Sequence, residues 1–413
     1  MQILYFIQQS IIWVITIYYI YELLISIFSF VKLKEKPLIK EKNHKFICIL
    51  PAHNEEAVIG NLVHSLQQQT YPKEFYDICV IADNCDDKTA EIAKEAGAMV
   101  FERHEPDKAK RTKGFALQKY IGTLLADENM DYDAFCIFDA DNIVDEKFLE
   151  AMNKHLCQGE EVVQGYRDIK NPTDSWIASG YALFYWMMNR FYHLARYNAG
   201  LSALLNGTGF MVKFDCIRNT GWDTNTLTED IEFSIKSIIG GKKVGWATDA
   251  KVYDEEPVDF KPSWKQRQRW TVGHIQVLKE YTKPLFKSTK EIKSLANIDG
   301  LLYIAGSIPM FVVTILLLFS NAIVYLNQGM TTEDFLINIL KYVIPTFLVP
   351  IIAAAYTMVL EKKSFKGMWK GLLLYPLFMG SWLLINFKCL FVQNTSWDKI
   401  DHTRSVKIEE VKK

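Results

Sequence analysis

Hydrophobic and polar residues follow different patterns in the two ends and the middle of this 413-residue chain. Residues 3–31 are almost wholly apolar and aromatic, Glu22 is their only charge, and lysines follow at positions 32, 34 and 36. About 20 apolar helical residues cross a bilayer, and this run has neither the basic start nor the small-residue cleavage site of a signal peptide. We therefore predict an N-terminal transmembrane anchor over residues 1–36. The lysines place the following chain on the cytosolic side.

The middle of the chain changes to short apolar runs separated by helical patterns. Strands are predicted over 45–50, 76–82, 98–102 and 134–138, with helices ending near Gln69 and covering 88–96 and 113–126. Alternation at this spacing predicts an α/β fold with a mostly parallel sheet, and ligands bind at the carboxyl ends of such strands. We assign residues 37–259 to this cytosolic domain.

Aromatic residues are dense in two later segments. The uncharged run 176–189 is too short to span a membrane, so it is either domain core, with some contact to an acceptor, or a helix near the membrane face. Residues 260–285 mix tryptophans with basic side chains, as an interfacial helix does, and we assign 260–295 to interfacial helices.

The C-terminal part contains three apolar runs, 301–326, 342–360 and 371–387. We assign 296–392 to a transmembrane region and 393–413 to a polar tail. Three crossings would leave this tail outside, whereas its lysines and Arg404 favour the inside. A re-entrant or interfacial third segment would remove the conflict, and we favour it.

Composition excludes several classes of function. The net charge of −1 argues against a nucleic-acid partner. The seven scattered cysteines contain no Cys-x-x-Cys pair, which predicts reduced thiols in a cytosolic domain and makes a zinc site improbable. The chain has neither the Gly-x-Gly-x-x-Gly of a dinucleotide site after its first strand nor a P-loop.

Two carboxylates follow the strand 134–138, at Asp139 and Asp141. Most Asp-x-Asp tripeptides lie in surface loops, but the apolar strand before this one places it at a sheet edge where sites occur. Carboxylate oxygens hold Mg²⁺ and Mn²⁺, and such an ion can bridge a diphosphate. We therefore predict a metal site at Asp139 and Asp141 that takes Mg²⁺ or Mn²⁺.

A second polar cluster lies between residues 227 and 270. Thr228 is a suitable N-cap, and Glu229 and Asp230 would then lie in the first turn of a helix, where backbone N–H groups favour carboxylates. Residues 266–270 read Gln-Arg-Gln-Arg-Trp. Two guanidiniums suit an anionic group, and a tryptophan suits the flat face of a sugar.

The motif Thr228-Glu229-Asp230, followed by 266–270 and preceded by Asp139-Ala140-Asp141, resembles the signature of the membrane-integrated, processive family 2 glycosyltransferases. These enzymes make cellulose, chitin, hyaluronan and poly-N-acetylglucosamine. The resemblance covers roughly residues 45–285. It implies a nucleotide-sugar-binding sheet of the glycosyltransferase A type, flanking transmembrane helices, a UDP-sugar donor and transfer with inversion.

The resemblance also implies roles for the residues of the second cluster. Asp230 would be the general base; by chemistry alone Glu229 could serve equally. Arg269 would neutralise the departing diphosphate, Trp270 would stack on the acceptor sugar, and Gln266 would complete the site.

Further substrate-binding residues are implied at the strand ends. Asp83 would bind the uracil ring, although Ala82 and Asn84 replace residues of the commoner Asp-Asp-Gly-Ser pattern. Pro51, Ala52, Asn54 and Glu55 would form the first nucleotide loop, with Glu55 contacting the ribose or base. Lys113 would approach the nucleotide phosphates. Gly207, Thr208 and Gly209 would form a turn beside the acceptor.

These features predict an inverting transferase that adds glucose or N-acetylglucosamine from its UDP derivative to a growing β-linked extracellular polysaccharide. It would be a multi-pass plasma-membrane protein with a cytoplasmic catalytic domain, and the small number of spans suggests a homo-oligomer or a secretion partner. One alternative is single addition to a glycolipid acceptor such as diacylglycerol, ceramide or polyprenyl phosphate. Another is a non-catalytic transport or anchor protein, which the full set of carboxylates disfavours.

Overall fold

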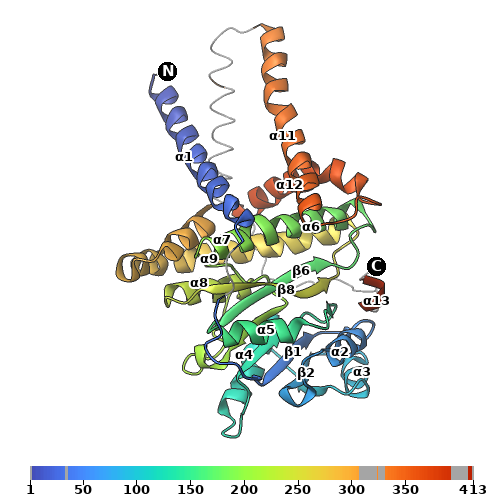
Figure 1. Ribbon diagram of the computed structural model, residues 1–413. Helices are drawn as coiled ribbons and strands as arrows, with labels where there is room; N and C mark the ends of the chain where they lie inside the picture. The colour runs from blue at the N-terminus through green and yellow to red at the C-terminus, as the bar shows by residue number, and fades with distance from the viewer. Residues whose placement is uncertain (1, 33–35, 307–322, 324–330, 392–407, 412–413) are drawn as a thin grey trace.

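An eight-stranded mixed sheet forms the centre of the protein, with strand order β3-β2-β1-β4-β7-β6-β8-β5. The computed structural model (Figure 1) describes residues 2–32, 36–306, 323, 331–391 and 408–411. The strands are β1 Phe46–Ala52, β2 Tyr76–Asp83, β3 Met99–Arg103, β4 Ala134–Ile137, β5 Ile143–Val144, β6 Val162–Ile169, β7 Phe210–Lys213 and β8 Val244–Asp254.

The first four strands, from β3 to β4, pair in parallel, as the sequence predicts. β7 is antiparallel to both β4 and β6, so the sheet is mixed. The start of β7 therefore lies beside the end of β4, where Gly209 N donates a 2.8 Å hydrogen bond to Ile137 O. This reversal brings the 206–209 turn next to the predicted metal site.

Helices cover both faces of the sheet (Figure 1). They are α1 Gln2–Ile27, α2 Ile59–Gln67, α3 Thr89–Glu95, α4 Lys113–Ala126, α5 Phe148–Cys157, α6 Trp176–Met187, α7 Ala195–Asn198, α8 Glu229–Ile239, α9 Phe260–Ile292, α11 Thr332–Leu360, α12 Trp369–Phe391 and α13 Ile408–Val411. A π-helical segment, Met188–Leu194, joins α6 to α7.

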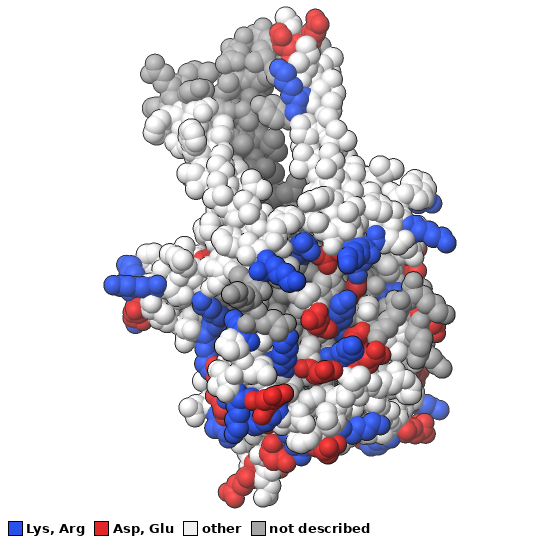
Figure 2. Space-filling view, viewed as in Figure 1, with Lys and Arg blue, Asp and Glu red and all other residues white. Residues whose placement is uncertain are grey.

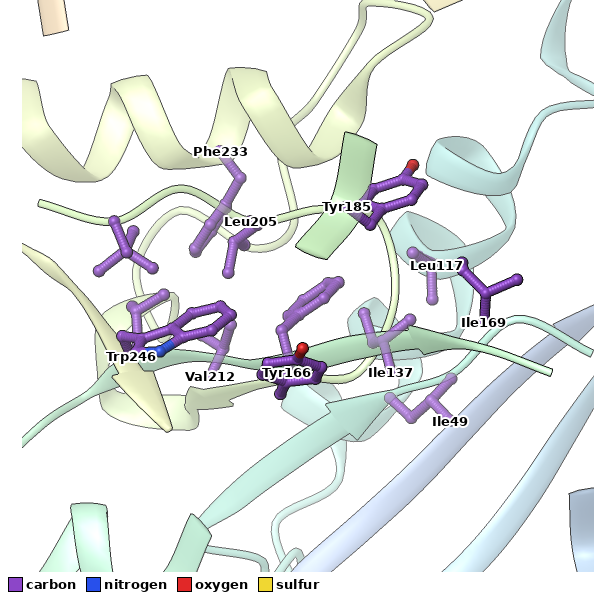
Figure 3. Packing of buried hydrophobic residues seen from close by; sticks show 14 of the residues in the cluster. Ile49, Leu117, Ile137, Tyr166, Ile169, Tyr185, Leu205, Val212, Phe233 and Trp246 are labelled. Carbon is purple, nitrogen blue, oxygen red and sulfur yellow. The ribbon is translucent and has the colours of Figure 1, made fainter. Parts of the chain in front are cut away.

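Alternate residues of β1 enter two separate cores. Ile47 and Ile49 pack in one, and Phe46, Cys48 and Leu50 in the other, as the two-residue period of a strand requires. Figure 3 shows the first core, in which side chains of the strands meet residues of α4, α6 and α8.

The aromatic segment 176–189 belongs mainly to this first core. Ile177, Tyr181, Leu183 and Trp186 of α6 are almost fully buried. Core packing is therefore the correct reading of this run, and the helix is not a membrane span.

Two described helical segments are long and apolar enough to cross a membrane, Gln9–Phe30 and Trp369–Phe391. Figure 1 shows α1 and α11 extending from the same side of the sheet domain, and Figure 2 shows few charges on them compared with that domain. The predicted span 342–360 lies within α11. Most of the predicted span 301–326 lies outside the described residues.

Glu22, the single charge of the predicted N-terminal span, anchors α1 to the domain. Its carboxylate accepts hydrogen bonds of 2.9 and 3.0 Å from Arg196 Nη2, and Arg196 Nε is also 3.0 Å from Asp299 Oδ2. Arg196 is fully buried, so both carboxylates neutralise a charge removed from water.

α12 packs on the domain along its whole length. Near its start, a Cβ on Gly371 would lie 2.0 Å from Ser179 Cβ on α6. Near its end, Lys388 Nζ donates a 3.1 Å hydrogen bond to Gln268 Oε1 on α9. Its opposite face exposes apolar side chains at Leu373, Leu377, Leu384, Phe387 and Phe391. Both ends of α12 therefore contact the domain.

The short helix α13, over residues 408–411, packs on the same domain. Ile408 in α13 is buried against Ile143 and Tyr253 on β5 and β8. This contact places α13 beside β5 and β8.

Candidate active site

A large cleft of about 1640 Å³ connects the carboxyl ends of the strands with α9 and α12. Its lining includes most of the residues that the sequence analysis selects. These are Pro51, Ala52, Glu55, Asp83, Lys113, Asp139, Asp141, Gly207, Glu229, Asp230, Gln266, Arg269 and Trp270.

Asp83 lies at the end of β2 and is held by a residue that the sequence analysis missed. Arg103 Nη1 donates a 2.7 Å hydrogen bond to Asp83 Oδ1, and both side chains are largely buried. Asn84 Nδ2 also donates to Oδ1, at 2.7 Å. The only available signal was that Arg103 ends β3, next to β2 in the sheet.

The loop after β1 lies beside Asp83. His53 Nδ1 is 2.7 Å from the backbone oxygen of Asp83, which joins the two strand ends. Asn54 has a φ of 57°, and its Oδ1 accepts a 2.8 Å hydrogen bond from Asp86 N. Asn54 therefore shapes the loop, whereas the buried Glu55 lines the cleft.

Asp139 and Asp141 both lie at the cleft just after β4. Asp141 is buried, and its Oδ2 accepts a 3.3 Å hydrogen bond from Glu255 N. Among the described residues there is no group of three or more His, Cys, Asp or Glu side chains arranged to hold a metal ion. Two carboxylates nevertheless fit Mg²⁺ or Mn²⁺, because Mg²⁺ usually binds through one or two carboxylates and substrate phosphates and keeps several waters.

Hydrogen bonds of Thr208 and Asn142 hold the segment that carries Asp139 and Asp141. Thr208 is fully buried, and its Oγ1 accepts a 3.0 Å hydrogen bond from Asp139 N and donates to Asn142 Oδ1. Asn142 Nδ2 donates to Asp254 Oδ1 at 2.6 Å. Gly209, with φ 61°, has no room for a Cβ, which would lie 2.4 Å from Val252 Cγ1. Of Gly207, Thr208 and Gly209, only Gly207 lines the cleft.

Lys113 joins the metal-site carboxylate to the start of α8. Its Nζ donates to Asp139 Oδ1 and to Gly207 O, both at 2.5 Å, and lies 3.5 Å from Glu229 Oε1. Burial lowers the pKa of Lys113, but Asp139 and Glu229 outweigh it and leave this pKa raised. The ammonium group therefore stays charged at the centre of the cleft.

Asp230 lies in the first turn of α8 and faces the turn at Gly207, where a Cβ would lie 3.4 Å from Asp230 Oδ2. Burial of the carboxyl and the adjacent Glu229 raise the pKa of Asp230 to about 7. Desolvation and a like charge both disfavour the ionised form. Such a pKa suits a group that exchanges protons near neutral pH.

Thr228 occupies the N-cap position of α8, but its side chain makes no capping hydrogen bond. Its Oγ1 is buried without a partner among the described residues. The loop before α8 is instead held by Glu232, whose Oε2 accepts hydrogen bonds of 2.8 and 2.7 Å from Asn225 N and Thr226 N. The side-chain cap expected from the sequence is therefore wrong, although the helix begins where predicted.

The two arginines of the 266–270 motif have different surroundings. Arg269 lines the cleft, whereas Arg267 is fully buried and donates to Phe378 O at 3.1 Å and Ser381 Oγ at 2.7 Å on α12. Arg267 therefore fixes α9 to α12 and does not supply an anion-binding group to the cleft.

Gln266 and Trp270 lie one turn apart on α9 and both line the cleft. Trp270 packs edge-on against Tyr181, with ring centroids 6.0 Å apart. Gln266 Oε1 is buried and has no hydrogen-bond partner among the described residues. Such an acceptor is costly unless a ligand satisfies it.

Comparison with known proteins agrees with this geometry. The sequence profile of the family described as "Glycosyl transferase family group 2" matches residues 134–360. This match covers more than half of the chain, and the chain belongs to that glycosyltransferase family.

Several characterised or classified proteins are similar to the chain. A probable glycosyltransferase, YdaM, of Bacillus subtilis (strain 168) is 27% identical over 94% of this chain and 93% of its own length. A beta-monoglucosyldiacylglycerol synthase of Trichormus variabilis (strain ATCC 29413 / PCC 7937) is 27% identical over 59% of this chain and 52% of its own length. A poly-beta-1,6-N-acetyl-D-glucosamine synthase of Staphylococcus epidermidis (strain ATCC 35984) is 25% identical over 69% of this chain and 68% of its own length.

A similar solved structure supports the fold. The mannosyltransferase PcManGT from Pyrobaculum calidifontis, in complex with GDP-Man and Mn²⁺, aligns with a TM-score of 0.57 at 15% identity. The alignment covers 91% of this chain and 99% of that chain. The expected glycosyltransferase A type fold is confirmed.

Proposed function

We propose that this glycosyltransferase is a membrane-bound, inverting enzyme that moves glucose or N-acetylglucosamine from a UDP-sugar to a growing β-linked polysaccharide. The observation that carries the proposal is the placement of Asp230, whose pKa is raised to about 7, in one cleft with Asp83, Asp139 and Trp270. A base, a nucleotide-binding carboxylate, a metal-binding carboxylate and a sugar-stacking ring are the parts that such a transfer needs.

The donor would lie along the strand ends. Asp83, held by Arg103, would accept a hydrogen bond from the nucleotide base, and Glu55, which lines the same cleft, would contact the base or ribose. Asp139 and Asp141 would hold Mg²⁺ or Mn²⁺, which supplies positive charge to the diphosphate when bound. Arg269 adds a guanidinium for the charge that develops as UDP leaves.

Asp230 would take the proton from the acceptor hydroxyl. The hydroxyl oxygen forms a bond to the anomeric carbon, the bond from that carbon to the diphosphate oxygen breaks, and its electron pair leaves with UDP. Attack opposite the leaving group inverts the anomeric centre without a covalent enzyme intermediate. A carboxylate of raised pKa is a stronger base than an ordinary aspartate and is still ionised in part at neutral pH.

Membrane attachment would come from α1 and α11, with the sheet domain on the cytosolic side of the plasma membrane. The apolar Gln9–Phe30 segment and the lysines that follow it support this orientation. A polysaccharide product is supported by the likeness to a protein named as a poly-N-acetylglucosamine synthase. With so few spans, we expect a second copy or a secretion partner to complete the export route.

A second candidate function is a single addition that makes a glycolipid. It is favoured by the likeness to proteins named beta-monoglucosyldiacylglycerol synthase and by the exposed apolar face of α12 beside the cleft. Both functions use the same donor chemistry and the same base, so they differ in the acceptor.

The test is incorporation by membranes that contain the full chain, supplied with Mg²⁺ or Mn²⁺ and a panel of labelled UDP-sugars, with product size resolved. High-molecular-weight product from one donor supports the polysaccharide synthase and identifies its sugar. A short, lipid-extractable product supports the glycolipid enzyme, and no incorporation from any donor contradicts both.

A further inference from the structure

α12 forms one wall of the cleft, although nothing in the catalytic proposal uses it. Its residues Met379, Trp382, Leu383, Asn386 and Lys388 all line the cleft. Trp382 and Asn386 are one helical turn apart and therefore share a face. They lie at the end of the cleft that Trp270 occupies, away from the nucleotide residues on the strands.

Trp382 extends the aromatic surface of Trp270. The two indole centroids are 6.3 Å apart, with an interplanar angle of 34°. Phe184 on α6 packs 5.2 Å from Trp382, and the Arg267 guanidinium lies 5.5 Å from the centroid of the Trp382 ring. These contacts fix the orientation of the indole, so little side-chain entropy of Trp382 would be lost when a ligand binds.

Polar groups border this aromatic surface. Asn386 Oδ1 accepts a 3.1 Å hydrogen bond from Thr271 Oγ1 on α9, which leaves Nδ2 as the other polar end of the amide. Lys388, two residues after Asn386, also lines the cleft, and its ammonium group donates a hydrogen bond to Gln268. A pyranose ring presents an apolar C–H face with hydroxyls around its edge, and an aromatic plane bordered by an amide is complementary to that shape.

We propose that Trp382 and Asn386 form a second acceptor subsite, which binds the sugar unit next to the one at Trp270. This inference rests on the proposed function and specifies its acceptor as a saccharide at least two units long. Two adjacent subsites would hold the product between additions, which is the physical requirement for repeated transfer to one chain.

The apolar residues Met379 and Leu383 on the same wall would also suit an acyl chain. The Thr271–Asn386 hydrogen bond and the Lys388 ammonium group favour a saccharide, because an acyl chain would leave these polar groups desolvated. A lipid occupant is therefore an outcome that the experiment must distinguish.

The experiment measures binding of cellotetraose and chitotetraose to the full chain in detergent with UDP and Mn²⁺ present, by calorimetry. Trp382→Ala should weaken binding of whichever tetrasaccharide binds by about tenfold, the loss expected for one stacking contact of roughly 1.4 kcal/mol. Trp382→Phe, which keeps a ring, should retain most of the affinity. Leu384→Ala, on the exposed face of α12, is the matched control and should bind as the unaltered chain does.

Trp382→Ala should also shorten the product without changing hydrolysis of the donor or its KM, whereas Leu384→Ala should leave the product length unchanged. Equal tetrasaccharide affinity in Trp382→Ala and the unaltered chain would overturn the inference. Failure of the unaltered chain to bind either saccharide while it glycosylates diacylglycerol would overturn it in favour of a lipid subsite. Tetrasaccharide binding that depends on Trp382, with no transfer from any donor, would support the subsite and refute the proposed function.

Discussion

The ammonium group of Lys113 lies 2.5 Å from a carboxylate oxygen of Asp139. The same nitrogen is 3.5 Å from Glu229, so one cation joins the predicted metal site to the first turn of the helix that carries Asp230. A metal ion and Lys113 therefore compete for the charge of Asp139. This relationship gives the lysine two measurable roles.

Lys113→Met should bind Mn²⁺ more tightly without nucleotide, because Asp139 then lacks its cationic partner. It should also raise the KM for the UDP-sugar by about tenfold, since a charge-assisted contact near the phosphates is lost. Calorimetric Mn²⁺ titration and donor kinetics measure the two effects. Lys119→Met, on the exposed side of the same helix, is the control. Weaker Mn²⁺ binding in Lys113→Met would contradict the competition.

Ionisation of the Asp230 carboxyl should produce an acidic limb in the pH profile of kcat/KM. Because the pKa of the Asp230 carboxyl is raised to about 7, activity should rise with pH through about 7 as the carboxyl becomes ionised. Glu229→Gln removes a neighbouring negative charge, lowers the pKa of Asp230 and should move the limb to lower pH. A limb that stays in place or moves to higher pH in this variant would show that Glu229 does not act on Asp230 in this way. Asp249→Asn, an exposed carboxylate on β8, should leave the limb unchanged.

Arg103 and Asp83 should act as one unit in donor binding. Asp83→Asn and Arg103→Met should each raise the KM for the UDP-sugar by about tenfold, because each leaves a buried partner without its ion pair. Residues in direct contact are not additive, so the double variant should lose much less than the product of the two single effects. Independent, multiplicative effects would mean that Arg103 does not position Asp83.

Gly273 on α9 packs against the start of α8. A Cβ at this position would lie 2.6 Å from Thr228 Cγ2 and 2.8 Å from Thr228 N. Gly273→Ala should therefore lower the free energy of unfolding by about 2 kcal/mol and reduce kcat, because it separates Trp270 from Asp230. Gly122→Ala is the control, since apart from the backbone of its own helix and its chain neighbours no atom lies within 4 Å of its Cβ position. Thermal unfolding in detergent and initial rates compare the two, and equal stability would contradict the close contact.

Local signals predicted the parts of the site that follow strands and helix starts. The apolar run before Asp139 and the acidic pair after Thr228 correctly located the end of β4 and the start of α8. Hydrophobic periodicity carries such information because the side chains that face the core recur with the period of a strand or of a helix. The separation of the two arginines in 266–270 was not predictable, because α12, far along the chain, buries Arg267.

The features that the sequence did not reveal depend on contacts between segments that are distant in the chain. The antiparallel placement of β7, the Arg103–Asp83 ion pair and the Thr208–Asn142 support all join segments that are distant in the chain. Composition predicted only that 371–387 is an apolar segment. The contacts of this segment with α6 and α9 place α12 at the wall of the cleft. A hydropathy pattern carries no information about such contacts.

The most direct measurement compares sugar transfer and UDP binding in the unaltered chain and in Asp230→Asn. The amide cannot take the acceptor proton, so transfer should fall by about 10²-fold or more. UDP should bind with unchanged affinity in the presence of Mn²⁺, because Asp83, Asp139 and Asp141 remain. This combination would establish Asp230 as the base of a glycosyl transfer. Near-normal transfer by Asp230→Asn would contradict the assignment on which the proposed mechanism depends.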